Sequence, residues 1–267
     1  MFSLLYYDIK ATAKKIFLIT LILLLFSVAV KLLWTKEFME NFDNSNFYIG
    51  NVIRFTAAGL LGAFTALAFL LLVLIQGRWF ADNILSNQGQ LTNMLPVSPF
   101  EIVLSKTLTA FIWSLLSVLT TAFIVAFFLY DTSMLDELLI ALDDFKQASG
   151  IELTTPSVLI SFFIYISIVV TSIVTLCFFS LTFGHCFSSF RNMAVFLSFV
   201  GIMLLQIIAI RFLGVRTLTS ILGTKDMQII AEFLLNTVKK LTIINVSLVC
   251  FYWLITSILL RNHRNLI

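Results

Sequence analysis

The chain has 267 residues, of which 60% are apolar and only 12% are charged, and its mean hydropathy is +1.04. These values exclude an ordinary soluble domain, in which about a quarter of the residues are charged. The formal net charge of +3 is spread along the chain and forms no basic stripe, which argues against a nucleic-acid partner. We therefore expect an all-α integral membrane protein.

The first fifteen residues are too charged to cross a bilayer. Phe2, Leu5, Ile9 and Ala13 recur at helical spacing. A polar side is supplied by Asp8, Lys10, Lys14 and Lys15. This pattern predicts an N-terminal interfacial helix over 1–15 that lies in the headgroup plane. An uncleaved signal-like start is the alternative.

Six apolar runs follow, and each is long enough to cross about 30 Å of hydrocarbon as a helix. We place these spans at about 16–34, 55–75, 107–130, 157–183, 193–210 and 241–260. No repeat, low-complexity tract or linker marks a second domain. The whole of 1–267 is therefore expected to form a single transmembrane domain.

The longest polar interruption on the expected cytoplasmic side covers residues 77–106, between the second and third spans. Ser98 is a good helix cap, Pro99 suits the first helical position, and Glu101 stands where it can return the hydrogen bond to the cap. Pro96 ends the short helix that we expect over 82–94, because a proline disfavours helical geometry in the residue before it. The loop is thus predicted to be a structured elbow.

Basic residues in the flanks set the orientation. With the N-terminus inside, the cytoplasmic flanks carry an excess of basic residues, and most of the acidic residues fall outside, in 36–48 and 131–152. Both termini are then cytoplasmic. The segment 225–240 has an apolar face of Ile229, Ile230, Phe233, Leu234 and Val238, and we predict an extracellular amphipathic helix before span six.

Motifs for chemistry are scarce. There is no phosphate-binding loop, so the chain is not expected to hydrolyse ATP alone, and we predict no catalytic residue, no metal site and no cofactor in it. The acidic residues are all expected in loops or at interfaces, which disfavours an ion relay. Gln206 lies within the fifth span and needs a partner, which could be another helix, a subunit interface or a solvated path. Ala58, Gly62 and Ala66 form a small-residue stripe that lets a helix approach closely, within the chain or in a dimer.

The order of these elements, together with GQLTNMLPVS at 89–98 and EIVLSK at 101–106, resembles the type-2 family of ATP-binding-cassette (ABC) export permeases over nearly the whole chain. The resemblance implies a permease that acts as a homodimer with two separate ATPase subunits, which bind ATP and magnesium. It also implies that the elbow is a cytoplasmic coupling helix seated on the ATPase. The residues that this assigns to coupling are Asp82, Gln88, Gly89, Gln90, Leu91, Leu95, Pro96, Ser98 and Glu101.

In that family the translocation cavity is usually lined by spans two and five. The resemblance therefore nominates a path of Phe64, Phe69, Phe196, Phe199, Met203 and Gln206. The cargo would be apolar or amphipathic, such as a peptide, an antibiotic or a lipid, and it would be exported across the cell (plasma) membrane.

Two other classes of function stay open. An integral membrane enzyme of lipid metabolism would need clustered Asp, His or Arg at a membrane face, and the sequence has no obvious cluster of this kind. An ion-coupled secondary transporter would need charges inside the membrane. A P-loop ATPase encoded beside this chain would favour the exporter.

Overall fold

The computed structural model describes residues 2–33, 47–86, 97–129, 140, 155–187, 190–218 and 227–264. Within these ranges the chain is helical, and six helices are long and apolar enough to span a membrane. This confirms the all-α class and the predicted number of spans, and it is the architecture of a multi-pass membrane protein.

Each spanning helix extends beyond the apolar run that predicted it. The helices are α1 (Phe2–Leu33), α3 (Phe47–Phe80), α5 (Pro99–Leu129), α7 (Thr155–His185), α8 (Arg191–Leu218) and α9 (Met227–Arg264). Hydropathy marks the part of a helix that suits hydrocarbon, whereas the backbone hydrogen bonding continues through the flanking polar residues. The runs therefore located the helices but underestimated their lengths.

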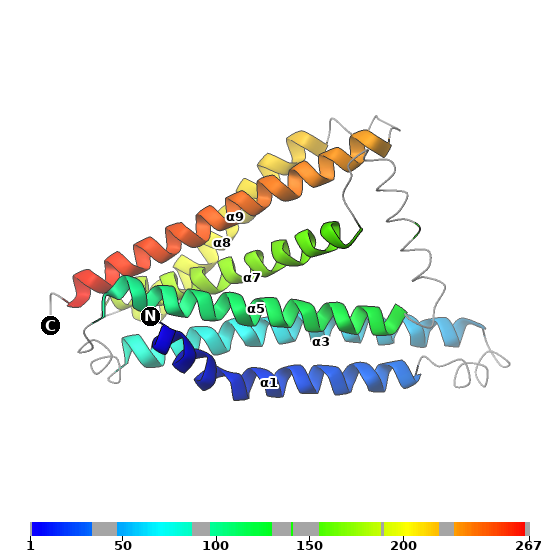
Figure 1. Ribbon diagram of the computed structural model, residues 1–267, viewed down its shortest axis with the longest axis horizontal. Helices are drawn as coiled ribbons and strands as arrows, with labels where there is room; N and C mark the ends of the chain where they lie inside the picture. Colours follow the sequence, from blue (N-terminus) through cyan, green and yellow to red (C-terminus); the bar gives the residue numbers. More distant parts are fainter. Residues whose placement is uncertain are drawn as a thin grey trace.

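Two predicted boundary elements are continuous with spans instead of separate. Residues 2–15 are the first turns of α1, and Figure 1 shows these turns running at an angle to the rest of that helix. The segment predicted as an amphipathic helix is helical from Met227 onward and continues without a break into the sixth span. Of its predicted apolar face, only the side chain of Val238 is among those that the structure describes, and it is half-buried.

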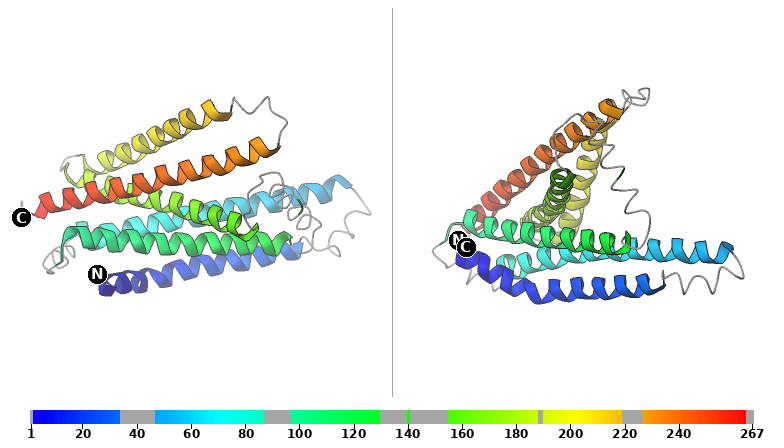
Figure 2. Two further views of the ribbon diagram at one scale, coloured as in Figure 1. Left: turned by 45° about the horizontal axis from the view of Figure 1, so that its top comes forward. Right: turned by 45° about the vertical axis from the view of Figure 1, so that its right-hand side comes forward.

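The helices converge at one end of the molecule and spread apart at the other. The start of α1 and the end of α9 lie at the converging end, and α1, α3 and α5 run side by side while α8 and α9 diverge from them (Figures 1 and 2). The helix α7 lies between these groups and contacts α3, α5, α8 and α9. It is therefore the central element of the bundle.

The contacts of α7 combine close packing with hydroxyl hydrogen bonds. Phe178 stacks on Phe80 of α3 with ring centroids 4.4 Å apart. Toward α5, the hydroxyls of Thr171 and Ser114 lie 2.9 Å apart, and such interhelical bonds suit an environment without water. Both rings and both hydroxyl-bearing side chains are buried, so this is the core of the bundle.

The helix α1 is fastened to α5 near both of its ends. At the diverging end, Lys31 donates a hydrogen bond of 2.5 Å to the carbonyl of Phe127, and its ammonium lies 4.0 Å from the ring centroid of the same residue. At the converging end the contact is a cluster of two charged groups, from α1 and α5, with neutral polar groups from the end of α3. The two charged side chains, Asp8 and Lys106, are both buried.

Candidate functional site

The cluster begins with a buried ion pair between α1 and α5. Asp8 and Lys106 are only 3% and 5% exposed, and the Lys106 ammonium lies 2.5 Å from the Asp8 carboxylate oxygen Oδ1. The other oxygen, Oδ2, accepts a hydrogen bond of 2.8 Å from the Ser105 hydroxyl. Each charge is thus met by a charged or polar partner in a site that water does not reach, as burial of an ion requires.

The end of α3 supplies the remaining partners. The Trp79 indole donates a 3.2 Å hydrogen bond to Asp8, and the Lys106 ammonium lies 4.9 Å from the Trp79 ring centroid, within the range of a cation–π contact. Asn83 lies in the π-helical turn η1 (Ala81–Leu85) that follows α3. With its amide oxygen facing the pair, it accepts from Lys106 and from Trp79, each at 3.2 Å. We call Asp8, Trp79, Asn83, Ser105 and Lys106 the charged junction.

A second hydrogen-bonded layer lies one helical turn further along α1. The Trp113 indole of α5 donates a 2.9 Å bond to the Thr12 hydroxyl, and Thr12 in turn donates a 2.8 Å bond to the carbonyl of Asp8. All three residues are buried. The layer holds the first turns of α1 against α5 and so keeps Asp8 in place for Lys106.

The position of Asp8 corrects the sequence-based interpretation. It was expected on the polar side of a surface helix together with Lys10, Lys14 and Lys15, and only these lysines are exposed. Asp8 instead faces the bundle, because Lys106 and Ser105 satisfy its carboxylate there. The expectation of an exposed carboxylate is therefore wrong for Asp8, which is 3% exposed.

The charged junction lies at the base of the predicted elbow. The cap at its far end is confirmed: the Glu101 N–H donates to the Ser98 hydroxyl at 3.3 Å, and the Ser98 N–H donates to the Glu101 carboxylate at 3.4 Å. The helix α5 begins at Pro99, and Lys106 follows about two turns later. At the near end, Asn83 belongs to η1. The chain therefore reaches junction residues within ten positions on either side of segment 87–96, at Asn83 before it and at Ser105 and Lys106 after it.

The other predicted coupling residues are placed only in part. Asp82 is exposed and lies in η1, which is contiguous with α3, so the first residues of the expected short helix prolong the second span. The remainder lie outside the residues that the structure describes: Gln88, Gly89, Gln90, Leu91, Leu95 and Pro96.

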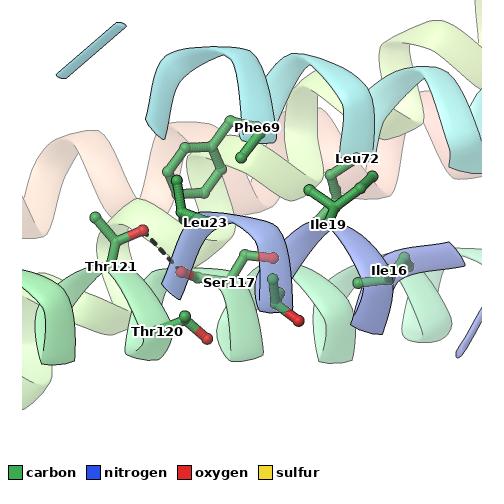
Figure 3. Close-up of a pocket in the computed structure, with 10 residues that line it drawn as sticks. Ile16, Ile19, Leu23, Phe69, Leu72, Ser117, Thr120 and Thr121 are labelled. Carbon is green, nitrogen blue, oxygen red and sulfur yellow. Dashed lines mark hydrogen bonds between the residues drawn. The ribbon is translucent and has the colours of Figure 1, made fainter. Parts of the chain in front are cut away.

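Phe69, one of the two predicted path residues on α3, lines an apolar groove that α3 forms with α1 and α5. Figure 3 shows Phe69 beside Leu23 of α1 and Leu72 beside Ile19, with Thr121 of α5 on the other side of Leu23. The groove holds about 350 Å³ of space, including its open side. Phe64 lines a neighbouring groove and stacks on a phenylalanine of α1 at 4.0 Å.

The path residues on α8 lie elsewhere. Phe196 is 66% exposed, whereas Phe199 and Met203 are half-buried. The Gln206 amide donates a hydrogen bond to the Tyr252 hydroxyl of α9, so its partner is another helix of the same chain. Within one copy of the chain, the predicted path residues therefore form two separate groups, one on α3 and one on α8.

The chemistry that the described residues offer is that of holding helices together. They contain no group of three His, Cys, Asp or Glu side chains that could hold a metal ion.

Sequence reasoning missed the Asp8–Lys106 pair. Lys106 follows Ser105 and precedes Thr107 in an otherwise apolar stretch, and a lysine in that setting signals a buried partner. No protein-family model, curated protein or solved structure matches the chain.

Proposed function

We propose that this chain is the permease subunit of an ATP-driven exporter, powered by separate ATPase subunits that dock on the elbow between α3 and α5. The observation that carries the proposal is the charged junction at the base of that elbow. It joins α1, α3 and α5 at the point where the elbow enters and leaves the bundle.

The junction suits the transmission of force. Separating one partner from a buried ion pair costs about 3–5 kcal/mol, whereas an exposed pair contributes at most about 1 kcal/mol. A pull on the elbow would therefore displace the three helices together before it separated Asp8 from Lys106. The Ser98–Glu101 cap stiffens the first turn of α5, so the displacement is not lost in a fraying helix end.

Transport in this proposal takes place between two copies of the chain. Closure of the ATPase subunits on ATP and magnesium would drive the two permeases to open a cavity outward. The small-residue stripe on α3 supports a dimer: a Cβ added at Gly62 would meet nothing within 4 Å, and Ala66 is exposed, so at these two positions the stripe is not covered by the described part of its own chain. In a dimer the phenylalanines of α3 and the residues of α8 could face one common path.

We infer the class of cargo from the surfaces of the chain that would contact it. The grooves beside α3 are lined mainly by apolar side chains with a few threonine and serine hydroxyls, which suits an apolar or amphipathic peptide, antibiotic or lipid. The chain itself would be no enzyme, since ATP and magnesium would bind only to the partner. We place it in the plasma membrane with both termini cytoplasmic, on the basis of its basic flanks.

An ion-coupled transporter is the second candidate, and the buried Asp8–Lys106 pair favours it, because charged residues inside membrane bundles often mark ion pathways. The two candidates respond differently to Asp8→Asn combined with Lys106→Met. An ion-coupled carrier that uses the pair would lose transport outright. A permease driven through the elbow would keep nucleotide-dependent transport, because a neutral replacement of both partners leaves α1, α3 and α5 packed together and still able to move as one.

Co-purification tests the docking directly. The chain would be expressed with the P-loop ATPase encoded beside it, and Leu91→Pro would be introduced into the elbow. We expect this helix-breaking change to abolish binding of the ATPase while the permease stays folded in the membrane. Arg261→Gln, an exposed change near the end of α9, is the matched control and should leave binding intact. Normal binding by the Leu91→Pro chain would refute the assignment.

A further inference from the structure

One side of α1 is largely exposed, and the kind of side chain on it changes in a regular order along the helix. The first two turns expose aromatic side chains, with Phe2 at 87%, Tyr6 at 67% and Tyr7 at 59%. The exposed lysines Lys10 and Lys14 follow one turn apart. Beyond them the exposed side chains are apolar: Phe17, Leu18, Leu21, Ile22 and Leu25.

These residues share one face because they recur at intervals of three and four, which places helical side chains above one another. The buried residues of the same helix, including Asp8, Thr12 and Ile16, recur on the opposite side. The outward face therefore runs from aromatic through cationic to apolar without interruption. The change from lysines to apolar side chains matches the boundary between the headgroups and the hydrocarbon at one surface of a bilayer, with the aromatic turns on the headgroup side.

The outward face of these first turns carries no acidic group. Asp8 is the only acidic residue among 1–15, and its carboxylate is turned inward, where Lys106 and Ser105 satisfy it. Lys10 is held over the neighbouring aromatic face, with its ammonium 5.9 Å from the ring centroid of Tyr6. The positive charge on the exposed side of these turns is thus not compensated within the first fifteen residues.

We propose that this face binds one acidic phospholipid, with its phosphate between Lys10 and Lys14 and its acyl chains along the apolar side chains that begin at Phe17. The two lysines are about 6 Å apart along the helix axis, so both ammonium groups can reach one phosphate. An acidic lipid is favoured over a zwitterionic one, because the headgroup of the latter brings its own cation to the site. Continuity with the apolar face identifies the ligand as a lipid, since a free phosphate would not use that face.

The proposal does not depend on transport, and its test needs no ATPase. The purified chain is placed in nanodiscs of equal phosphatidylglycerol and phosphatidylcholine, and native mass spectrometry counts the lipids that stay bound after release. Lys10→Gln with Lys14→Gln removes the proposed site. Lys239→Gln with Lys240→Gln is the matched control, because these two lysines are also exposed but lie on α9 toward the diverging end.

We expect the wild-type chain and the α9 control to retain phosphatidylglycerol preferentially, and the Lys10/Lys14 variant to lose roughly fivefold or more of that preference. Arginine at both positions should restore it, and higher salt should weaken it in the wild type. Both glutamines replace exposed helical residues, so the thermal stability of the variant should match that of the control. An unchanged preference in the Lys10/Lys14 variant, or an equal loss in the α9 control, would overturn the assignment.

Discussion

Asp8→Asn tests the charged junction most sharply, because it removes one charge with almost no change in shape. The substitution leaves the Lys106 ammonium, which is 5% exposed, without its anion. Loss of one partner from a buried ion pair costs about 3–5 kcal/mol, mainly through the uncompensated charge that stays behind. Lys106→Met should cost a similar amount, because it leaves the Asp8 carboxylate unpaired instead.

The double variant separates this explanation from simple damage to packing. With both charges removed, the methionine would keep most of the length of the lysine that it replaces, and its sulfur could contact the Trp79 ring. The free energy of unfolding should then return to within about 1 kcal/mol of the wild type, because neutral replacement of a buried pair is often tolerated. The single changes would add to about 6–10 kcal/mol if they were independent.

The assay is unfolding of the detergent-solubilised chain by titration with dodecyl sulfate, followed by tryptophan fluorescence and circular dichroism. Trp79 and Trp113 lie in and beside the junction, so fluorescence reports on it locally. If each single change costs less than about 1 kcal/mol, the pair does not fasten the helices. A double variant as unstable as the sum of the singles would show that packing, and not charge, dominates.

Three further outcomes follow from contacts elsewhere in the chain. Ser98→Ala removes the cap of α5 and should cost about 1 kcal/mol of local helix stability, measured by hydrogen exchange in 99–102. The coupling of transport to ATP hydrolysis should fall as well. Unchanged coupling would contradict the role of the elbow as a lever. Gly184→Ala should destabilise the bundle by about 1–3 kcal/mol in thermal unfolding, because the added Cβ would clash with the Val195 side chain and would lie 3.1 Å from the Arg191 carbonyl oxygen of α8. Gly59→Ala, with nothing within 4 Å, should be neutral or stabilising. Equal effects of the two changes would refute the close approach of α7 and α8. Gln206→Leu should lower the free energy of unfolding by about 0.6 kcal/mol in thermal unfolding, because the hydrogen bond to α9 is lost. A loss of transport with intact stability would instead place this amide in the cargo path.

The spans and the helix cap could be predicted because they depend on local sequence. An apolar run of about 20 residues has few alternatives to a spanning helix, and over its described residues each of the six runs coincides with a long helix. The Ser98–Glu101 cap needs only residues three apart, and its two reciprocal hydrogen bonds are present. Such features follow from the covalent spacing of the chain, whatever the tertiary arrangement.

The Asp8–Lys106 pair could not be predicted in this way, because its partners are 98 residues apart and belong to different helices. Lys106 in its apolar stretch signals a buried partner, but nothing local identifies Asp8, which has the pattern of a surface charge near a membrane boundary, as that partner. Only the packing of α1 beside α5 converts both into buried groups, and that packing is decided by the whole bundle. The same reason explains why the phenylalanines predicted to share a path lie on separated helices within one chain.

Nucleotide-dependent transport by the reconstituted complex would decide whether this chain is an ATP-driven permease. The chain and its neighbouring P-loop ATPase would be placed together in liposomes, and ATP turnover and cargo movement would be measured against a panel of amphipathic peptides and lipids. We expect a transported cargo to stimulate ATP turnover, and Leu91→Pro in the elbow to abolish both stimulation and transport. Transport at an undiminished rate by the chain alone, without the ATPase or ATP, would refute ATP-driven export.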